Sequence, residues 1–229
     1  MAVTTPIIED SMRKNLFRAA LLCGAIPLLA ACATNPADQA RQLQADPRCC
    51  TALPALAAER LLGPGALKGA LSAGSAIVSL PAGRSASDAY QLPAEAAGRV
   101  LELTALIGPG LLGEMDTAVV APVAAIFLDR NGQPLAAAGD TGYMAANGGL
   151  TDAFLVSRQY RVPAGASRVV VHADPAKFGT RQALDLGAPN FMRPASGVYV
   201  AFKGRESVKA QWAVFGPYTV ALREPRAGR

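Results

Sequence analysis

The sequence predicts an all-β protein, namely a β-sandwich of jelly-roll type that occupies residues 75–224. From Ser75 onward, apolar and polar residues alternate with a period of two, which is typical of half-buried strands. Proline, glycine and Asn-Gly signals separate these segments, as they separate the short strands of sandwiches. About eight or nine strands are expected, preceded by a signal peptide, a tether and a short helix.

The expected strands follow one another closely along the chain. They cover residues 76–80, 90–92, 100–106, 119–128, 154–162, 168–173, 197–202, 211–215 and 218–223. Leu101 and Leu103 would share one face of their strand and Glu102 the other. Asn131-Gly132 indicates a hairpin turn, because both positions accept positive φ.

Three stretches are expected to lack regular structure. Residues 139–150 are rich in glycine and alanine, and residues 177–196 hold several glycines and prolines, so both predict long loops. Residues 225–229 are expected to form a disordered tail.

The first residues have the order of a secretory signal peptide, 1–31. The apolar run 19–29 follows three basic residues and is shorter than the about 20 residues of a membrane-spanning helix. The small residues Leu29, Ala30 and Ala31 then precede Cys32, an order similar to the lipobox that lipoprotein peptidases read. An ordinary signal peptide with an incidental cysteine is the alternative.

Cleavage before Cys32 would leave its thiol acylated and the mature chain anchored in a membrane. Two or more acyl chains give stable anchoring, whereas one gives marginal binding. Ala33 rather than aspartate follows the cysteine, which in well-studied lipoprotein sorting indicates the outer membrane. We therefore expect an outer-membrane lipoprotein that faces the periplasm. Either Met1 or Met12 is the true start.

Two segments are expected between the anchor and the sandwich. Residues 32–48 are polar and predict a lipidated tether that lifts the domain off the membrane. Residues 49–74 predict a short helical lead-in, because Leu53, Leu56 and Leu61 recur at near-helical spacing.

Because Cys23 leaves with the signal peptide and Cys32 is acylated, the adjacent Cys49 and Cys50 would carry the thiols that remain in the mature chain. Free thiols seldom persist in an oxidising periplasm. Neighbouring Cα atoms lie about 3.8 Å apart, below the usual disulfide span of about 4.4–6.8 Å. A vicinal disulfide with a structural role, which we favour, and pairing to another molecule are the alternatives. Two cysteines do not suffice for a structural zinc site.

The net charge of +5 comes from scattered basic residues. A nucleic-acid protein would gather them on one face among aromatic residues, so no nucleic-acid partner is expected. The sequence has no paired metal-binding histidines, no Cys-x-x-Cys and no glycine-rich phosphate loop between strand and helix. No metal or cofactor is therefore expected.

His172, the one histidine, lies two residues before Asp174 on a predicted strand, so the two side chains could meet. A hydrolase would use Asp174 to orient His172 and a serine as nucleophile. The sequence contains no Gly-x-Ser-x-Gly elbow to supply that serine. We favour a strand-end histidine beside a turn, with no catalytic role.

Aromatic side chains are the other candidates, because exposed rings of β-sandwiches commonly bind sugars. Trp212, Tyr143 and Tyr160 are the proposed ligand platform. Aromatics make up only 6% of the chain, and packing in the core or at strand edges is the interpretation that we favour for most of them.

Several stretches together resemble the maltose operon periplasmic protein family. They are residues 90–94 leading into 100–104, residues 119–122 leading to 128–129, residues 168–178 and residues 216–220. The resemblance implies an envelope protein that accompanies maltose or maltodextrin uptake, binds carbohydrate or assists transport, and has no established enzymatic role. Well-known members are soluble and carry a C-terminal extension, unlike this chain. The same stretches also resemble pre-peptidase C-terminal modules, which are β-sandwiches.

The predicted function is therefore a non-enzymatic, lipid-anchored accessory or binding protein linked to carbohydrate uptake. Its expected partners are the membrane, carbohydrate and sugar-transport components. A structural lipoprotein of an envelope complex is the first alternative. A hydrolase that uses His172 and Asp174 is the second.

Overall fold

The computed structural model describes residues 35–58, 60–106, 117–147, 154–185, 190–195, 198–203 and 207–225. The predicted signal peptide, its motif Leu29, Ala30 and Ala31, and Cys32 lie outside these residues, as do residues 226–229 of the expected tail. Within the described part of the chain, no helix combines the length and the apolar character needed to cross a bilayer.

The regular elements follow one another closely in the described residues. The helical elements are α2 (Pro36–Ala45) and the 3-10 turns η3 (Leu53–Ala55), η4 (Ala94–Ala96) and η5 (Pro175–Lys177). The strands are β1 (Arg60–Leu61), β2 (Leu67–Leu71), β3 (Ala76–Leu80), β4 (Gly83–Gln91), β5 (Val100–Leu106), β6 (Thr117–Val120), β7 (Val123–Leu128), β8 (Pro134–Leu135), β9 (Met144–Asn147), β10 (Phe154–Arg161), β11 (Arg168–Ala173), β12 (Arg181–Asp185), β13 (Asn190–Ala195), β14 (Val198–Lys203), β15 (Ser207–Trp212) and β16 (Gly216–Arg223).

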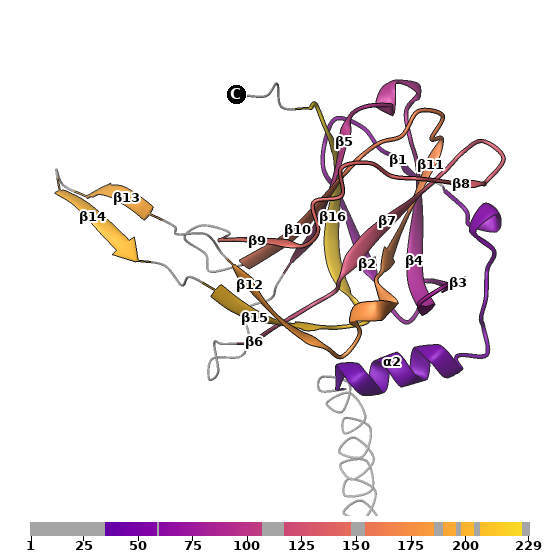
Figure 1. Ribbon diagram of the computed structural model, residues 1–229, viewed down its shortest axis with the longest axis horizontal. Helices are drawn as coiled ribbons and strands as arrows, with labels where there is room; N and C mark the ends of the chain where they lie inside the picture. The colour runs from indigo at the N-terminus through magenta and orange to yellow at the C-terminus, as the bar shows by residue number, and fades with distance from the viewer. Residues whose placement is uncertain are drawn as a thin grey trace, which may run out of the picture. The chain divides into compact units, whose positions relative to one another are not determined.

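Two main sheets make up the domain (Figure 1). The first has the order β1-β4-β11-β7-β8, with β3 also paired to β4, and the second has the order β2-β16-β5-β10-β9. The chain crosses between the sheets from β4 to β5 and from β10 to β11, as in β-sandwiches. The prediction of an all-β sandwich is confirmed.

The core lies between these two sheets. Phe127 and Val169 point into it from the first sheet, and Leu103 and Val220 from the second, all with 0% exposure. Leu101 is buried beside Leu103, as the alternation in that strand predicts. Burial of apolar side chains from both inner faces is the main source of stability in such a sandwich.

A smaller sheet and a separate strand pair complete the description. The small sheet has the order β12-β15-β6, in which β6 runs parallel to β15. The strands β13 and β14 pair with each other in antiparallel fashion.

The structure divides or shifts several expected strands. The expected strand 119–128 ends and restarts around Pro122, because proline has no N–H for the ladder, so β6 joins β15 while β7 joins β11. The expected loop 139–150 contains β9, and the expected loop 177–196 contains β12 and β13. The strand expected at 211–215 lies at 207–212 instead.

Both segments expected before the sandwich also differ. Residues 36–45 of the predicted tether form α2, which Asn35 and Pro36 start: asparagine is favoured at the N-cap, and proline at the first helical position. The predicted helical lead-in 49–74 contains η3, β1 and β2 instead. The near-helical spacing of the leucines does not reflect a helix here. Leu61 is exposed and its neighbour Leu62 is buried, as in an extended chain whose side chains alternate between two faces.

Candidate functional site

A gap in the first sheet opens the interior of the sandwich to solvent. β3 pairs with β4 as far as Ser87, and β1 joins the same edge at Tyr90, so Asp88 and Ala89 lie between the two partners. A cavity of about 460 Å³ occupies this gap. Its volume falls within the range of about 300–1,000 Å³ that small-molecule sites have.

Charged and apolar side chains meet in this cavity, which we call the Asp88 pocket. Arg60 from β1 and the half-buried Asp88 from β4 line it together with Tyr90. Leu56 and Ala70 are among its apolar walls. Ala70 belongs to β2, so the second sheet also contributes to the pocket.

A chain of hydrogen bonds leads from the core to Asp88. Tyr218 Oη lies 2.6 Å from Asp88 Oδ2 and 2.7 Å from Tyr90 Oη. A carboxylate only accepts, so Tyr218 donates to Asp88, and Tyr90 in turn donates to Tyr218. Burial, and next the hydrogen bond to Asp88, raise the pKa of Tyr218, which keeps its hydroxyl protonated as this direction requires.

Arg60 is held beside the carboxylate without being bonded to it. Its guanidinium lies 5.0 Å from the centre of the Tyr90 ring, a cation–π distance. Arg60 Nη2 donates to Lys68 O at 2.6 Å, which links β1 to β2. Among the described residues, no hydrogen bond reaches Asp88 Oδ1, so this oxygen can accept one from a ligand.

Gly69 makes the tyrosine pair possible. A Cβ at this position would lie 2.6 Å from Tyr218 Oη and 2.7 Å from Tyr90 Oη, closer than real Cβ contacts. The two hydroxyls therefore lie against the backbone of Gly69, where a side chain would not fit. This close approach of β2 fixes where the hydrogen-bond chain meets the pocket.

A second cavity, of about 560 Å³, lies at the end of the sandwich. Asp129 and Arg130 from the β7–β8 turn line it. Asp129 Oδ1 already accepts hydrogen bonds from the backbone N–H groups of Asn131 and Gln133, which shape the turn. This carboxylate has a structural task, and the Asp88 pocket is the stronger candidate for binding.

The predicted ligand platform is found in the interior. Trp212 and Tyr160 have exposures of 0% and 4%, and Tyr143 is half-buried, with its ring centre 4.7 Å from that of Trp212. A stacking platform needs exposed ring faces. The three residues therefore do not form the exposed platform that the sequence suggested, although the structure does bring them together.

The rings surround Arg158, which points inward from β10. Its guanidinium lies 4.7 Å from the Tyr143 ring centre and 5.3 Å from that of Tyr160. Arg158 Nε and Nη2 donate to the two oxygens of Asp140 at 2.9 and 2.6 Å, and Asp174 Oδ2 lies 3.9 Å from Nη1. The hydrogen bonds from Arg158 lower the pKa of Asp140. We call these residues the Arg158 cluster.

His172 and Asp174 do not form a catalytic pair in this arrangement. His172 Nδ1 lies 2.9 Å from Ala173 O, and burial lowers the pKa of the imidazole. Asp174 accepts from the Ala176 N–H at 3.1 Å and approaches Arg158. A carboxylate that caps η5 and neutralises an arginine is not orienting the imidazole, so the geometry favours the structural interpretation of His172.

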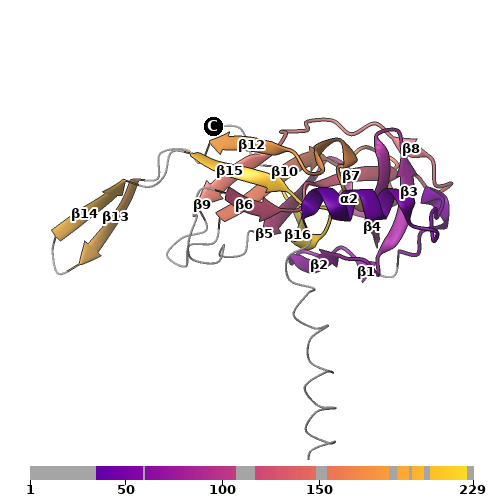
Figure 2. The ribbon, with the colours of Figure 1, turned by 90° about the horizontal axis from the view of Figure 1, so that it is seen from below.

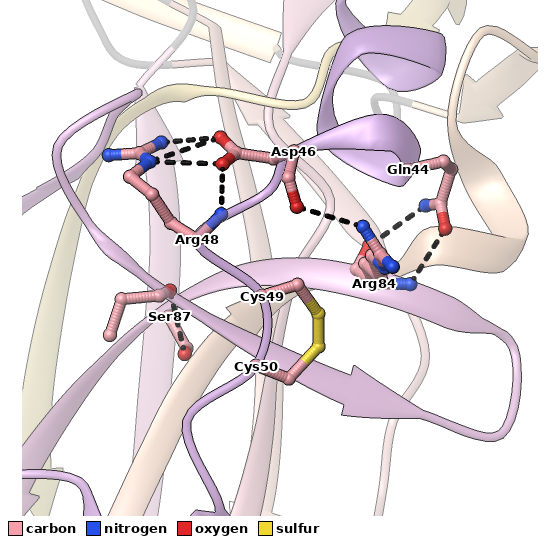
Figure 3. Close-up of a disulfide and its surroundings, with 8 residues drawn as sticks. Gln44, Asp46, Arg48, Cys49, Cys50, Arg84 and Ser87 are labelled. Atoms are coloured by element: carbon pink, nitrogen blue, oxygen red, sulfur yellow. Dashed lines mark hydrogen bonds and ion pairs between the residues drawn. A yellow bond between two sulfur atoms is a disulfide. The ribbon is translucent and has the colours of Figure 1, made fainter.

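Cys49 and Cys50 form a disulfide beside the β3–β4 hairpin (Figure 3). Cys49 is half-buried in a small apolar cluster with Ile77, whereas Cys50 is exposed. Just before them, hydrogen bonds from Arg48 lower the pKa of Asp46 to about 2. Because Cys49 packs against Ile77 of β3, the geometry favours a structural role for the disulfide.

The absence of a metal-binding cluster in the described residues and three comparisons with known proteins complete the description of the site. In the described residues, no three His, Cys, Asp or Glu side chains gather in a way that could hold a metal ion. Searches of the chain against protein-family models, curated proteins and solved structures find no match in any of the three. The resemblance to the maltose operon periplasmic family therefore stays a prediction.

The sequence did not indicate Arg60, Asp88 or Tyr218 as site residues. The available signal was the alternation of Ala86, Asp88 and Tyr90, which puts an acidic residue on the inward face of a strand. It was missed because the strand was predicted only from residue 90.

Proposed function

We propose that this chain is a non-enzymatic, lipid-anchored accessory protein of the cell envelope that binds a carbohydrate in the Asp88 pocket. The observation that carries the proposal is the meeting of an acceptor carboxylate, a guanidinium and the Tyr90 ring in one open cavity, with the carboxylate held by a hydrogen bond from Tyr218. Specific small-molecule sites have this form, with a few convergent polar groups among apolar walls.

The chemistry of the pocket matches that of sugars. Sugar hydroxyls both donate and accept, so they can donate to Asp88 Oδ1 and accept from the N–H groups of Arg60 that are not used by Lys68 O. The apolar walls, including Leu56 and Ala70, suit the C–H faces of a sugar ring. The resemblance to the maltose operon family makes maltodextrins the first ligands to try.

The location proposed for the protein is the periplasmic side of the outer membrane. The order of small residues before Cys32 supports it, and the position after Cys32 lacks aspartate. Labelling cells with radioactive palmitate is expected to mark the wild-type protein and to spare Cys32→Ala. An unlabelled wild-type protein would contradict the anchor while leaving the pocket untouched.

Calorimetric titration tests the binding function. Maltodextrins and a panel of other glycans are titrated into the wild-type protein and into Asp88→Asn. Binding heat is expected with at least one glycan, with affinity reduced about tenfold or more in Asp88→Asn, because a charged acceptor makes the stronger hydrogen bond. Arg130→Gln, in the other cavity, is the matched control. Absence of heat with every glycan would refute the proposal.

A further inference from the structure

The helix α2 is fixed to the sandwich at its C-terminal end. Leu43 has an exposure of 4% and packs with Ile77 and Val214. The Gln44 amide donates to Arg84 O at 3.1 Å and accepts from Arg84 N at 3.0 Å, as a neighbouring strand would (Figure 3). These contacts hold the helix against the β3–β4 hairpin.

The N-terminal end of α2 is in contact with the domain as well. Gly179, with φ of +70°, lies so near Ala37 that a Cβ built on it would meet Ala37 Cβ at 3.5 Å. This glycine follows η5, so the first turn of α2 lies beside the segment from η5 to the start of β12. Figure 2 shows α2 running alongside the sheets rather than away from them.

Few residues separate the docked helix from the predicted lipidation site. Ala33, Thr34 and Asn35 are the residues between Cys32 and Pro36. A fully extended chain advances at most about 3.6 Å per residue, so Pro36 lies within about 14 Å of the residue that would carry the acyl chains. A lipid at Cys32 would therefore keep this side of the domain at the headgroups.

We propose that the domain rests directly on the bilayer, with the start of α2 and the segment 176–181 against anionic lipid headgroups. This inference rests on the proposed lipidation. Lys177 and the exposed Arg181 flank Gly179 and supply positive charge that an anionic surface attracts. The acidic residue of the first turn, Asp38, is paired with Arg41, so it does not oppose this attraction.

Quenching by brominated lipids tests the orientation in the full-length, acylated protein. The protein is reconstituted into vesicles of phosphatidylglycerol and phosphatidylethanolamine, and a tryptophan is introduced by Ala176→Trp at an exposed position of η5. Arg130→Trp is the matched control, because the β7–β8 turn lies at the opposite end of β7 from Val123, which pairs with Ala173. The signal of Trp212, present in both variants, is subtracted using the wild type.

Bromolipid quenching at position 176 is expected to exceed that at position 130 by about twofold or more, and to fall when Lys177→Glu and Arg181→Glu are added. Insertion of a long Gly/Ser linker between Ala33 and Thr34, which keeps Asn35 next to Pro36, should reduce it further. Equal quenching at both positions in a palmitate-labelled protein would overturn the docking and leave the anchor intact. An unlabelled protein would overturn the anchor, and this inference with it.

Discussion

Two polar clusters involve charged side chains that point between the main sheets, and they differ in what completes them. In the Arg158 cluster, an inward arginine is enclosed by two rings and two carboxylates, and its side chain is 17% exposed. In the Asp88 pocket, an inward carboxylate meets two neutral hydroxyls, and a cavity of about 460 Å³ adjoins it. The first cluster is completed by the chain itself, whereas the second leaves an acceptor for a ligand.

We infer from this difference that the charge of Arg158 stabilises the fold, whereas the charge of Asp88 is available for binding. A charge inside a protein needs compensation, which ion pairs and hydrogen bonds provide. Arg158 receives this compensation in full from Asp140, Asp174 and the rings. Asp88 receives one strong hydrogen bond from Tyr218 and retains contact with water through the pocket.

The largest effect is expected from Arg158→Met. The substitution removes the positive charge between Asp140 and Asp174, and we expect a loss of about 3 kcal/mol in the free energy of unfolding, at the low end for broken buried pairs because Asp140 keeps partial access to water. Urea unfolding measures it. Arg158→Lys keeps the charge but loses the bidentate geometry, so its free energy of unfolding should lie between those of the wild type and Arg158→Met. A change below about 1 kcal/mol would show that the cluster is not structural.

A smaller loss is expected from Gly69→Ala. The added methyl group would press on the Tyr218 and Tyr90 hydroxyls, and overpacking of this kind costs about 1–3 kcal/mol. Gly63→Ala is the matched control, because a Cβ there meets nothing within 4 Å. Equal unfolding midpoints for the two variants would contradict the described approach of β2 to the tyrosine pair.

The direction of the hydrogen-bond chain predicts a further difference. Tyr218→Phe leaves both Asp88 and Tyr90 without their partner, and should cost about 1–2 kcal/mol, whereas Tyr90→Phe leaves the bond to Asp88 intact and should cost about 0.5–1 kcal/mol. Urea unfolding of both variants provides the comparison. A larger loss for Tyr90→Phe would reverse the assigned direction.

Acid should weaken the Arg158 cluster. The pKa of Asp140 is lowered by hydrogen bonds from Arg158, so its stabilising effect is complete above the unfolded pKa of about 3.9 and is lost as the pH falls through the folded value. Asp140→Asn should therefore flatten the dependence of the melting temperature on pH below about pH 4. Parallel curves for the variant and the wild type would contradict this assignment.

The sandwich could be predicted from the sequence because apolar and polar residues alternate along a strand that has one buried face. Strands β3, β5 and β11 have the predicted bounds. The prediction failed for α2, whose ten residues include only Leu43 as a buried side chain, so no apolar stripe indicated a helix. The start signal, Asn35 before Pro36, lies in the polar segment 32–48 that the sequence predicts as a tether.

The candidate site was harder to predict for a different reason. Asp88 and Tyr218 are 130 residues apart in the sequence, and only the packing of the two sheets against each other brings them together. Trp212 was a candidate for a ligand platform because exposed rings bind sugars, yet its 0% exposure follows from packing that no local pattern reveals. Neighbourhood in the sequence likewise suggested His172 with Asp174, although Asp174 approaches Arg158.

Amide NMR spectra recorded during titration with the glycan that gives calorimetric heat test the contrast between the clusters most directly. Signals of Arg60, Asp88 and Tyr90 are expected to shift with ligand, and those of Asp140 and Arg158 to stay in place. Shifts centred on Arg158, with the Asp88 pocket unaffected, would contradict the account.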